Sequence, residues 1–178
     1  MTVMKLMSGV IAATLAVVLM ATGCTTTKKK KEEYTHVRIY VQTVATLPEG
    51  YRFKIDFPHP NIWFWVNSIP ELTEDDLIGA ETVPGDAGLQ IKLKFNHHGE
   101  FVLEGLTGSN RGKYMAVIAA RAGIARAIAP ILIKGINRSG ELIFTPDLTD
   151  EETTKIVSDL NKVATTIRSN DTWGMSKP

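Results

Sequence analysis

The side chains best suited to bind a partner are two tryptophans, Trp63 and Trp65, which are separated by Phe64. Because side chains alternate between the two faces of a strand, the tryptophans would share one face and Phe64 would take the other. Tryptophan is over-represented among the residues that dominate binding energy, so an exposed pair would anchor a partner or a peptide. A buried pair would simply belong to the hydrophobic core, and the sequence leaves both interpretations open.

The histidines and carboxylates do not form a catalytic or metal-binding pattern. His97 and His98 are adjacent, and neighbouring side chains on a helix diverge by about 100°. The acidic runs at 74–76 and 150–152 stand where helix N-termini favour negative charge. The segment 105–113 contains a Gly-Lys pair but lacks the spacing of a phosphate-binding loop. We therefore expect no catalytic residue, no metal ligand and no cofactor, and the alternative is an enzyme whose site assembles from scattered residues.

The chain has a single cysteine, Cys24, at the end of a segment with three parts. Lys5 gives a positive charge, residues 6–20 are an uncharged apolar run, and residues 21–23 are small. This order is typical of a signal peptide, and its ending resembles a bacterial lipobox, in which the cysteine thiol is acylated. We predict a lipoprotein signal peptide over 1–23 and lipid attachment at Cys24. Two alternatives stay open: an uncleaved transmembrane anchor, and a signal peptide cut elsewhere that leaves Cys24 unmodified.

Residues 24–34 are polar and are predicted to be a lipidated tether whose partner is the membrane of the cell envelope. The nine residues 25–33 reach at most about 30 Å when extended, so the domain would stay near the bilayer. That bilayer would be the outer or inner membrane, at its periplasmic face, or the outer face of the cell membrane. The lysines at 28–31 would attract anionic headgroups by about 1 kcal/mol each, or merely keep a solvated spacer extended. The chain has 20 Lys and Arg against 19 Asp and Glu, a balance that argues against a nucleic-acid partner.

Alternation of apolar and polar residues predicts strands over 37–41, 53–57 and 89–95. Two shorter strands are expected as well, an aromatic one over 62–66 and another over 141–144, after a turn at 137–140. Residues 113–133 include a run that is apolar on both faces, which suits either a strand, turn and strand or a buried helix. Gly123 favours the hairpin, because glycine costs a helix about 1 kcal/mol and suits a turn.

Three further segments predict helices from their caps and their apolar spacing. Thr73 would cap a short helix over 70–80. A second helix, over 97–107, would bury three apolar residues, Phe101, Val102 and Leu106. The third begins with Thr149 and Glu152 at the spacing of a capping box, carries one apolar stripe and should fray from 170.

Together these elements predict a single α+β domain over 35–170, followed by a flexible tail over 171–178. The expected architecture is a mostly antiparallel sheet with two amphipathic helices packed on one face. A domain of this length buries enough surface for one core but not for two.

Four segments of the second half occur, in the same order, in a known protein family. They are residues 88–95, 106–113, 129–133 and 144–152. Over 79–163 the chain resembles the extracytoplasmic head of SecD, a subunit of the bacterial protein-export machinery. The resemblance implies a small α+β head in which 113–133 form a hairpin and whose counterpart engages polypeptide emerging from the membrane channel. SecD also has membrane-spanning helices with ionisable residues, which the sequence after residue 24 lacks, so the resemblance implies binding and not a motor role.

The resulting hypothesis is a membrane-anchored, non-enzymatic lipoprotein that binds polypeptide or scaffolds an envelope complex. Trp63 and Trp65 are its candidate partner-binding residues. A hydrolase-like envelope enzyme would be favoured if His97 or His98 lay beside an acidic side chain in a deep pocket. A shallow apolar patch around Trp63 would favour binding, and a surface with neither feature would favour a purely structural envelope component.

Overall fold

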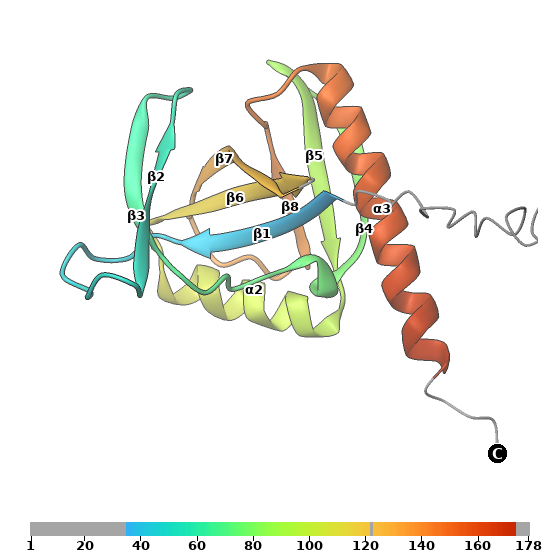
Figure 1. Cartoon of the computed structure of the whole chain (residues 1–178), viewed down its shortest axis with the longest axis horizontal. Helices are drawn as coiled ribbons and strands as arrows, with labels where there is room; N and C mark the ends of the chain where they lie inside the picture. Colours follow the sequence, from blue (N-terminus) through green and yellow to red (C-terminus); the bar gives the residue numbers. More distant parts are fainter. Residues whose placement is uncertain (1–34, 122, 174–178) are drawn as a thin grey trace, which may run out of the picture. The chain divides into compact units, whose positions relative to one another are not determined.

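Antiparallel strands and two long helices make up the described part of the chain, which is residues 35–121 and 123–173 of a computed structural model. In chain order the elements are β1 (Thr35–Val41), β2 (Arg52–Phe57), β3 (Ile62–Asn67), the 3-10 turn η1 (Glu74–Asp76), β4 (Leu77–Gly85), β5 (Gly88–Phe95), α2 (His97–Ser109), β6 (Tyr114–Arg121), β7 (Ile124–Leu132), β8 (Glu141–Phe144) and α3 (Asp150–Trp173). The strands pair in the orders β1–β6–β7, β2–β3 and β4–β5–β8 (Figure 1). The predicted α+β class is confirmed, with the antiparallel pairing spread over three sheets.

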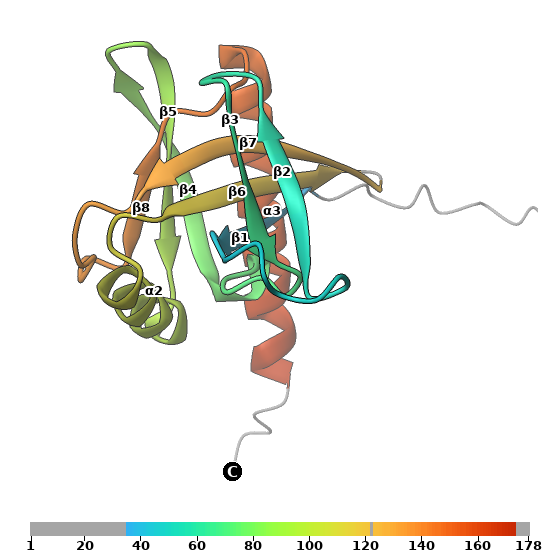
Figure 2. The same ribbon diagram turned by 90° about the vertical axis from the view of Figure 1, so that its left-hand side faces the viewer.

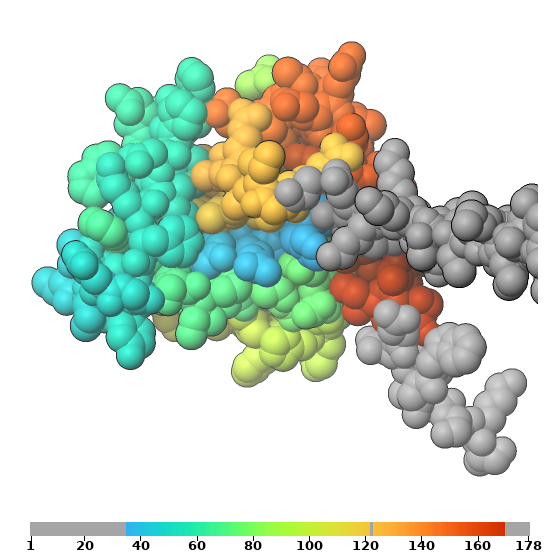
Figure 3. Space-filling model, viewed as in Figure 1, coloured from blue at the N-terminus to red at the C-terminus, as the bar shows by residue number. Residues whose placement is uncertain are grey.

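The β1–β6–β7 sheet lies between two hydrophobic layers. On one face Val37, Ile39 and Val117 join the main core, to which the β4–β5–β8 sheet, α2 and α3 also contribute. On the other face Tyr40 and Ala116 contact a second cluster formed with the β2–β3 hairpin. The hairpin lies across this face (Figure 2) and is part of the surface beside β7 and β1 (Figure 3). A sheet covered on both faces explains why β6 is apolar from Met115 to Ala120, before it ends at the exposed Arg121.

Residues 113–133 form the β6–β7 hairpin, the alternative that Gly123 favoured over a buried helix. Gly123 has a φ of 81°, in the left-handed region that glycine adopts without strain. The hairpin closes with Arg121 opposite Ile124. At its β6 edge Thr35, the first described residue of the chain, pairs with Arg121, so β1 begins beside the hairpin tip.

The predicted helix over 70–80 is wrong. Thr73 does cap a turn, because its hydroxyl accepts from the Asp75 amide and its own amide donates to the Asp76 carboxylate. That turn ends after Asp76, and from Leu77 the chain is strand β4. A register shift between Leu77 and Gly79 lets Leu77 and Ala80, three residues apart, both join the main core. A β-bulge therefore gives this strand the apolar spacing of a helix.

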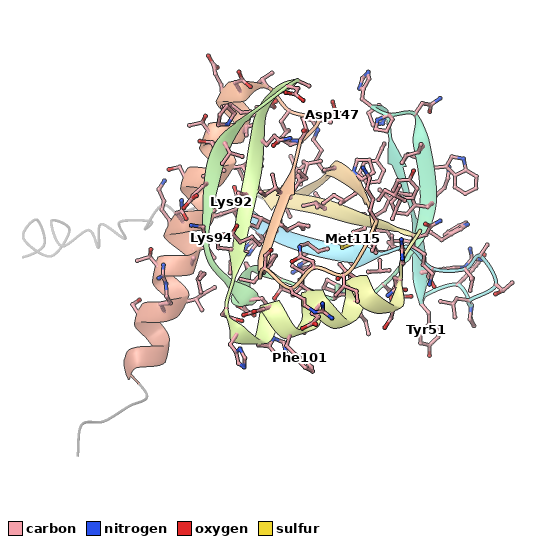
Figure 4. All side chains as sticks on the ribbon, turned by 180° about the vertical axis from the view of Figure 1, so that it is seen from behind. Tyr51, Lys92, Lys94, Phe101, Met115 and Asp147 are labelled. Carbon is pink, nitrogen blue, oxygen red and sulfur yellow. The ribbon has the colours of Figure 1, made fainter. Side chains whose placement is uncertain are left out.

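Helix α2 is where it was predicted, but the prediction that it buries Phe101 is wrong. Its core-facing residues include Gly99, Leu103 and Leu106, whereas Phe101 is 74% exposed and Val102 is half-buried. A Cβ at Gly99 would lie 2.9 Å from the Cβ of Phe95 and 3.0 Å from that of Asp76, so this position has no room for a side chain. Phe101 follows by two residues, about 200° around the helix, and points away from the body of the domain (Figure 4).

Helix α3 runs to Trp173, past residue 170, where the pattern predicted its end. The predicted capping box is confirmed, since the Thr149 amide donates to the Glu152 carboxylate and the Glu152 amide donates to the Thr149 hydroxyl. This contact with Thr149 lowers the pKa of Glu152. The side-chain amide of Asn161 pairs with both backbone groups of Ala80 on the edge strand β4, so α3 also covers a sheet edge.

Candidate functional site

The two tryptophans lie on the outward face of the β2–β3 hairpin. Phe64 and Val66 point inward and are buried, while Trp63 is 59% exposed and Trp65 is half-buried. The alternation predicted from the sequence is therefore correct. The structure also settles which face is which, because the phenylalanine side covers the β1–β6–β7 sheet and the tryptophan side faces solvent.

Aromatic ring contacts lie within the hairpin and between the hairpin and the sheet beneath it. The ring of Phe64 stacks on Phe57 at 5.5 Å and on Tyr114 of β6 at 5.4 Å between centroids. Tyr40 of β1 meets Phe53 edge-on at 5.2 Å. Such pairs add about 0.5–1.5 kcal/mol each to the burial of the rings themselves. The tryptophans are thus held on a packed support, which limits the conformational entropy lost when a partner binds.

Two cations lie against the tryptophan rings. The Arg52 guanidinium is 4.0 Å from the ring centre of Trp65, and the Lys54 ammonium is 4.7 Å from that of Trp63. Arg52 also donates to the Leu47 carbonyl at 2.6 Å, and Lys54 pairs with Asp56 at 2.8 Å. We name Arg52, Lys54, Trp63 and Trp65 the tryptophan face. It offers flat apolar rings with positive charge beside them.

The histidines do not come together in a catalytic or metal-binding site. Nδ1 of His98 is 2.7 Å from the carboxylate of Asp76, whose side chain is only 12% exposed, but the His98 ring itself is 74% exposed and faces solvent. His36 makes a separate pair with Glu74 at 2.6 Å. Among residues 35–121 and 123–173, no three His, Cys, Asp or Glu side chains are placed to hold a metal ion together.

A cavity of about 390 Å³ lies between the β6–β7 hairpin and α3, and sequence reasoning missed it. Apolar side chains such as Ile128 and Ile156 line it together with charged ones, including Arg121, Arg126 and Asp159. Asp159 is 9% exposed and accepts from the Thr35 hydroxyl at 3.3 Å. These residues come from three separate stretches of the chain, so no local motif marks them.

Cys24 and the predicted signal peptide lie outside the described residues, as do positions 174–178 of the predicted tail. Within the part that is described, no helix combines the length and the apolar character needed to cross a membrane.

No protein-family model matches the chain, and no curated protein matches it. Two solved structures of SecDF share its fold. The first, described as a membrane component that enhances protein export, has a TM-score of 0.53 and 18% sequence identity over 72% of this chain. The second, SecDF in a super-membrane-facing form, has a TM-score of 0.52 and 19% identity over 72% of this chain.

The domain has a SecDF-like fold. The chain covers 63% of the length of the first structure and 19% of the second. The predicted SecD-head-like architecture is thereby confirmed.

Proposed function

We propose that this chain is a non-enzymatic lipoprotein, anchored to the cell-envelope membrane through acyl chains on Cys24, whose tryptophan face binds polypeptide. The observation that carries the binding role is the outward position of Trp63, which is 59% exposed on a hairpin packed against the central sheet. A core role for this side chain would have required the opposite face of the strand.

The composition of the tryptophan face supports polypeptide as its partner. Tryptophan rings take up apolar side chains of any sequence, and the Arg52 guanidinium beside them complements an acidic side chain, whereas Lys54 is already paired with Asp56. An extended polypeptide presents both kinds of group. The likeness to SecDF agrees with this role, since the first SecDF structure is described as enhancing protein export.

The sequence of the N-terminal segment supports the anchor. An apolar run after Lys5 precedes small residues and the chain's single cysteine. One acyl chain holds a protein to a membrane only marginally, whereas two or more make attachment stable. Metabolic labelling with an alkyne fatty acid should mark the wild type and not Cys24→Ala. A wild type that stays unlabelled while it remains bound to the membrane would refute the anchor.

The binding role is tested with an unfolded polypeptide of known sequence. Reduced, carboxymethylated lactalbumin carrying fluorescein is titrated with the full chain in detergent, and binding is followed by anisotropy. If Trp63 and Trp65 each contribute about 2 kcal/mol, as interface anchors do, each change to alanine weakens binding about 30-fold. Phe101→Ala is the matched control, because Phe101 is a similarly exposed aromatic residue on α2. Equal binding by Trp63→Ala, Trp65→Ala and Phe101→Ala would reject the tryptophan face.

A further inference from the structure

The tip of the β6–β7 hairpin has an exposed apolar side chain. Ile124 is 75% exposed, about as much as Ile69 and Phe101, which are each 74% exposed. It follows Gly123, where even an added Cβ would have no atom within 4 Å. Ile124 lines the cavity between the hairpin and α3, and three quarters of its surface still faces solvent.

Two arginines flank this isoleucine. The side chain of Arg121 is 45% exposed, and its nearest carboxylate, that of Asp159, is 3.8 Å away. The side chain of Arg126 is 53% exposed, lies 3.6 Å from the Glu152 carboxylate and donates to the Asp147 carbonyl at 2.8 Å. Both guanidinium groups therefore keep access to solvent. An apolar residue between basic ones suits a membrane interface, because the apolar group can insert while the cations stay at the headgroups.

The tip also lies where the chain leads towards its proposed anchor. Thr35 pairs with Arg121 across neighbouring strands, so the two are about 5 Å apart. The ten residues between Cys24 and Thr35 span at most about 35 Å. By contrast, β1 carries the chain about 20 Å away from the tip before it reaches the loops that hold the exposed Val44 and Ile69. Figure 2 shows the tip projecting beyond the β2–β3 hairpin, with β1 beginning beside it.

We propose that the β6–β7 tip is a second membrane contact, in which Ile124 enters the interface of an anionic bilayer and Arg121 and Arg126 bind its headgroups. The proposal rests on the proposed anchoring at Cys24, which holds the tip near the bilayer. The lysines at 28–31 would add to the attraction. Anchor and tip together would fix the orientation of the domain, with the tryptophan face at the other end of β1.

The test places a fluorescent reporter at the tip. Ile124→Cys in the full chain is labelled with the dye NBD and reconstituted into vesicles of phosphatidylethanolamine and phosphatidylglycerol that contain a headgroup-nitroxide lipid. Ile69→Cys and Phe101→Cys are the matched controls, because both residues are 74% exposed and lie away from the tip. We expect the emission of NBD at position 124 to be bright, blue-shifted and quenched by the nitroxide. NBD at positions 69 and 101 should show the dim, red-shifted emission of the dye in water.

Unquenched NBD at position 124, or equal quenching at all three positions, would overturn the tip contact. Equal quenching in phosphatidylcholine vesicles would overturn the role given to the arginines. The wild type serves as the control for the anchor, since its only thiol is Cys24. Labelling of the wild type would mean that Cys24 is free, which would overturn the proposed anchor and the tip contact with it. If NBD at position 124 is not quenched and the wild type stays unlabelled, the tip contact alone is overturned.

Discussion

Asn161 should be a major stabilising residue of α3 although it is polar and lies at the surface. Its Oδ1 accepts from the Ala80 amide and its Nδ2 donates to the Ala80 carbonyl, both at 2.8 Å. Ala80 is 4% exposed with Asn161 in place, so the side chain shields these backbone groups from water. Two hydrogen bonds at about 1 kcal/mol each predict that Asn161→Ala loses about 2 kcal/mol. For a domain of this size that is a fall in Tm of about 5–10 °C.

The assay is urea unfolding of the full chain in detergent, followed by circular dichroism, with hydrogen exchange at Ala80 as a local probe. Alanine favours helix more than asparagine does, so a loss of stability cannot come from helix propensity. Thr165→Ala is the matched control, because the Thr165 hydroxyl only donates to the Asn161 carbonyl within the same exposed helix face. Asn161→Asp should also be destabilising, since a carboxylate keeps the acceptor but turns its second oxygen towards the Ala80 carbonyl. If Asn161→Ala unfolds within 0.5 kcal/mol of Thr165→Ala (about the scatter of neutral surface changes), the reasoning is refuted.

Two further predictions concern packing and pH. Gly99→Ala should destabilise the protein by about 1–3 kcal/mol, because the new Cβ meets packed atoms. Gly105→Ala, with open space around it, should instead stabilise the protein by about 0.5–1 kcal/mol. Urea unfolding midpoints of the two variants test this, and equal shifts of the midpoint would contradict it. Hydrogen bonds from Lys94 and Lys92 lower the pKa of Glu81 from 4.5 to about 2, so its carboxylate contributes stability above pH 4.5 that is lost as the pH falls towards 2. Glu81→Gln should therefore lose less stability than the wild type between pH 4.5 and 2 at low salt, and parallel pH profiles would contradict the assignment.

Sequence patterns predicted most of the elements because their signals are local. The strand patterns of β1, β2, β3, β5 and β8 and the capping box at Thr149 each depend on a few neighbouring residues, and all of these elements are present. The errors have non-local causes. The bulge at the start of β4 gave Leu77 and Ala80 a helical spacing, and the side of α2 that carries Gly99 packs against Asp76, far away in the sequence, while Phe101 lies on the opposite side.

The candidate site could be predicted only in part for the same reason. Alternation put Trp63 and Trp65 on one face, but whether that face was core or surface depended on which side of the hairpin met the β1–β6–β7 sheet. Tyr40 illustrates the converse, since it lies on the polar side of β1 in the pattern and is 6% exposed because the hairpin covers it. The position of the β6–β7 tip beside the start of β1 could not be predicted, because it depends on the long-range pairing of Thr35 with Arg121.

The central claim, that the tryptophan face binds polypeptide, is tested most directly by photocrosslinking. Benzoylphenylalanine is placed at position 63, and in a second variant at position 101, and each full chain is irradiated with the unfolded lactalbumin. The account predicts adducts from position 63, mapped to apolar segments of the lactalbumin, and none above background from position 101. Equal yields from the two positions, or no adduct from position 63, would contradict it.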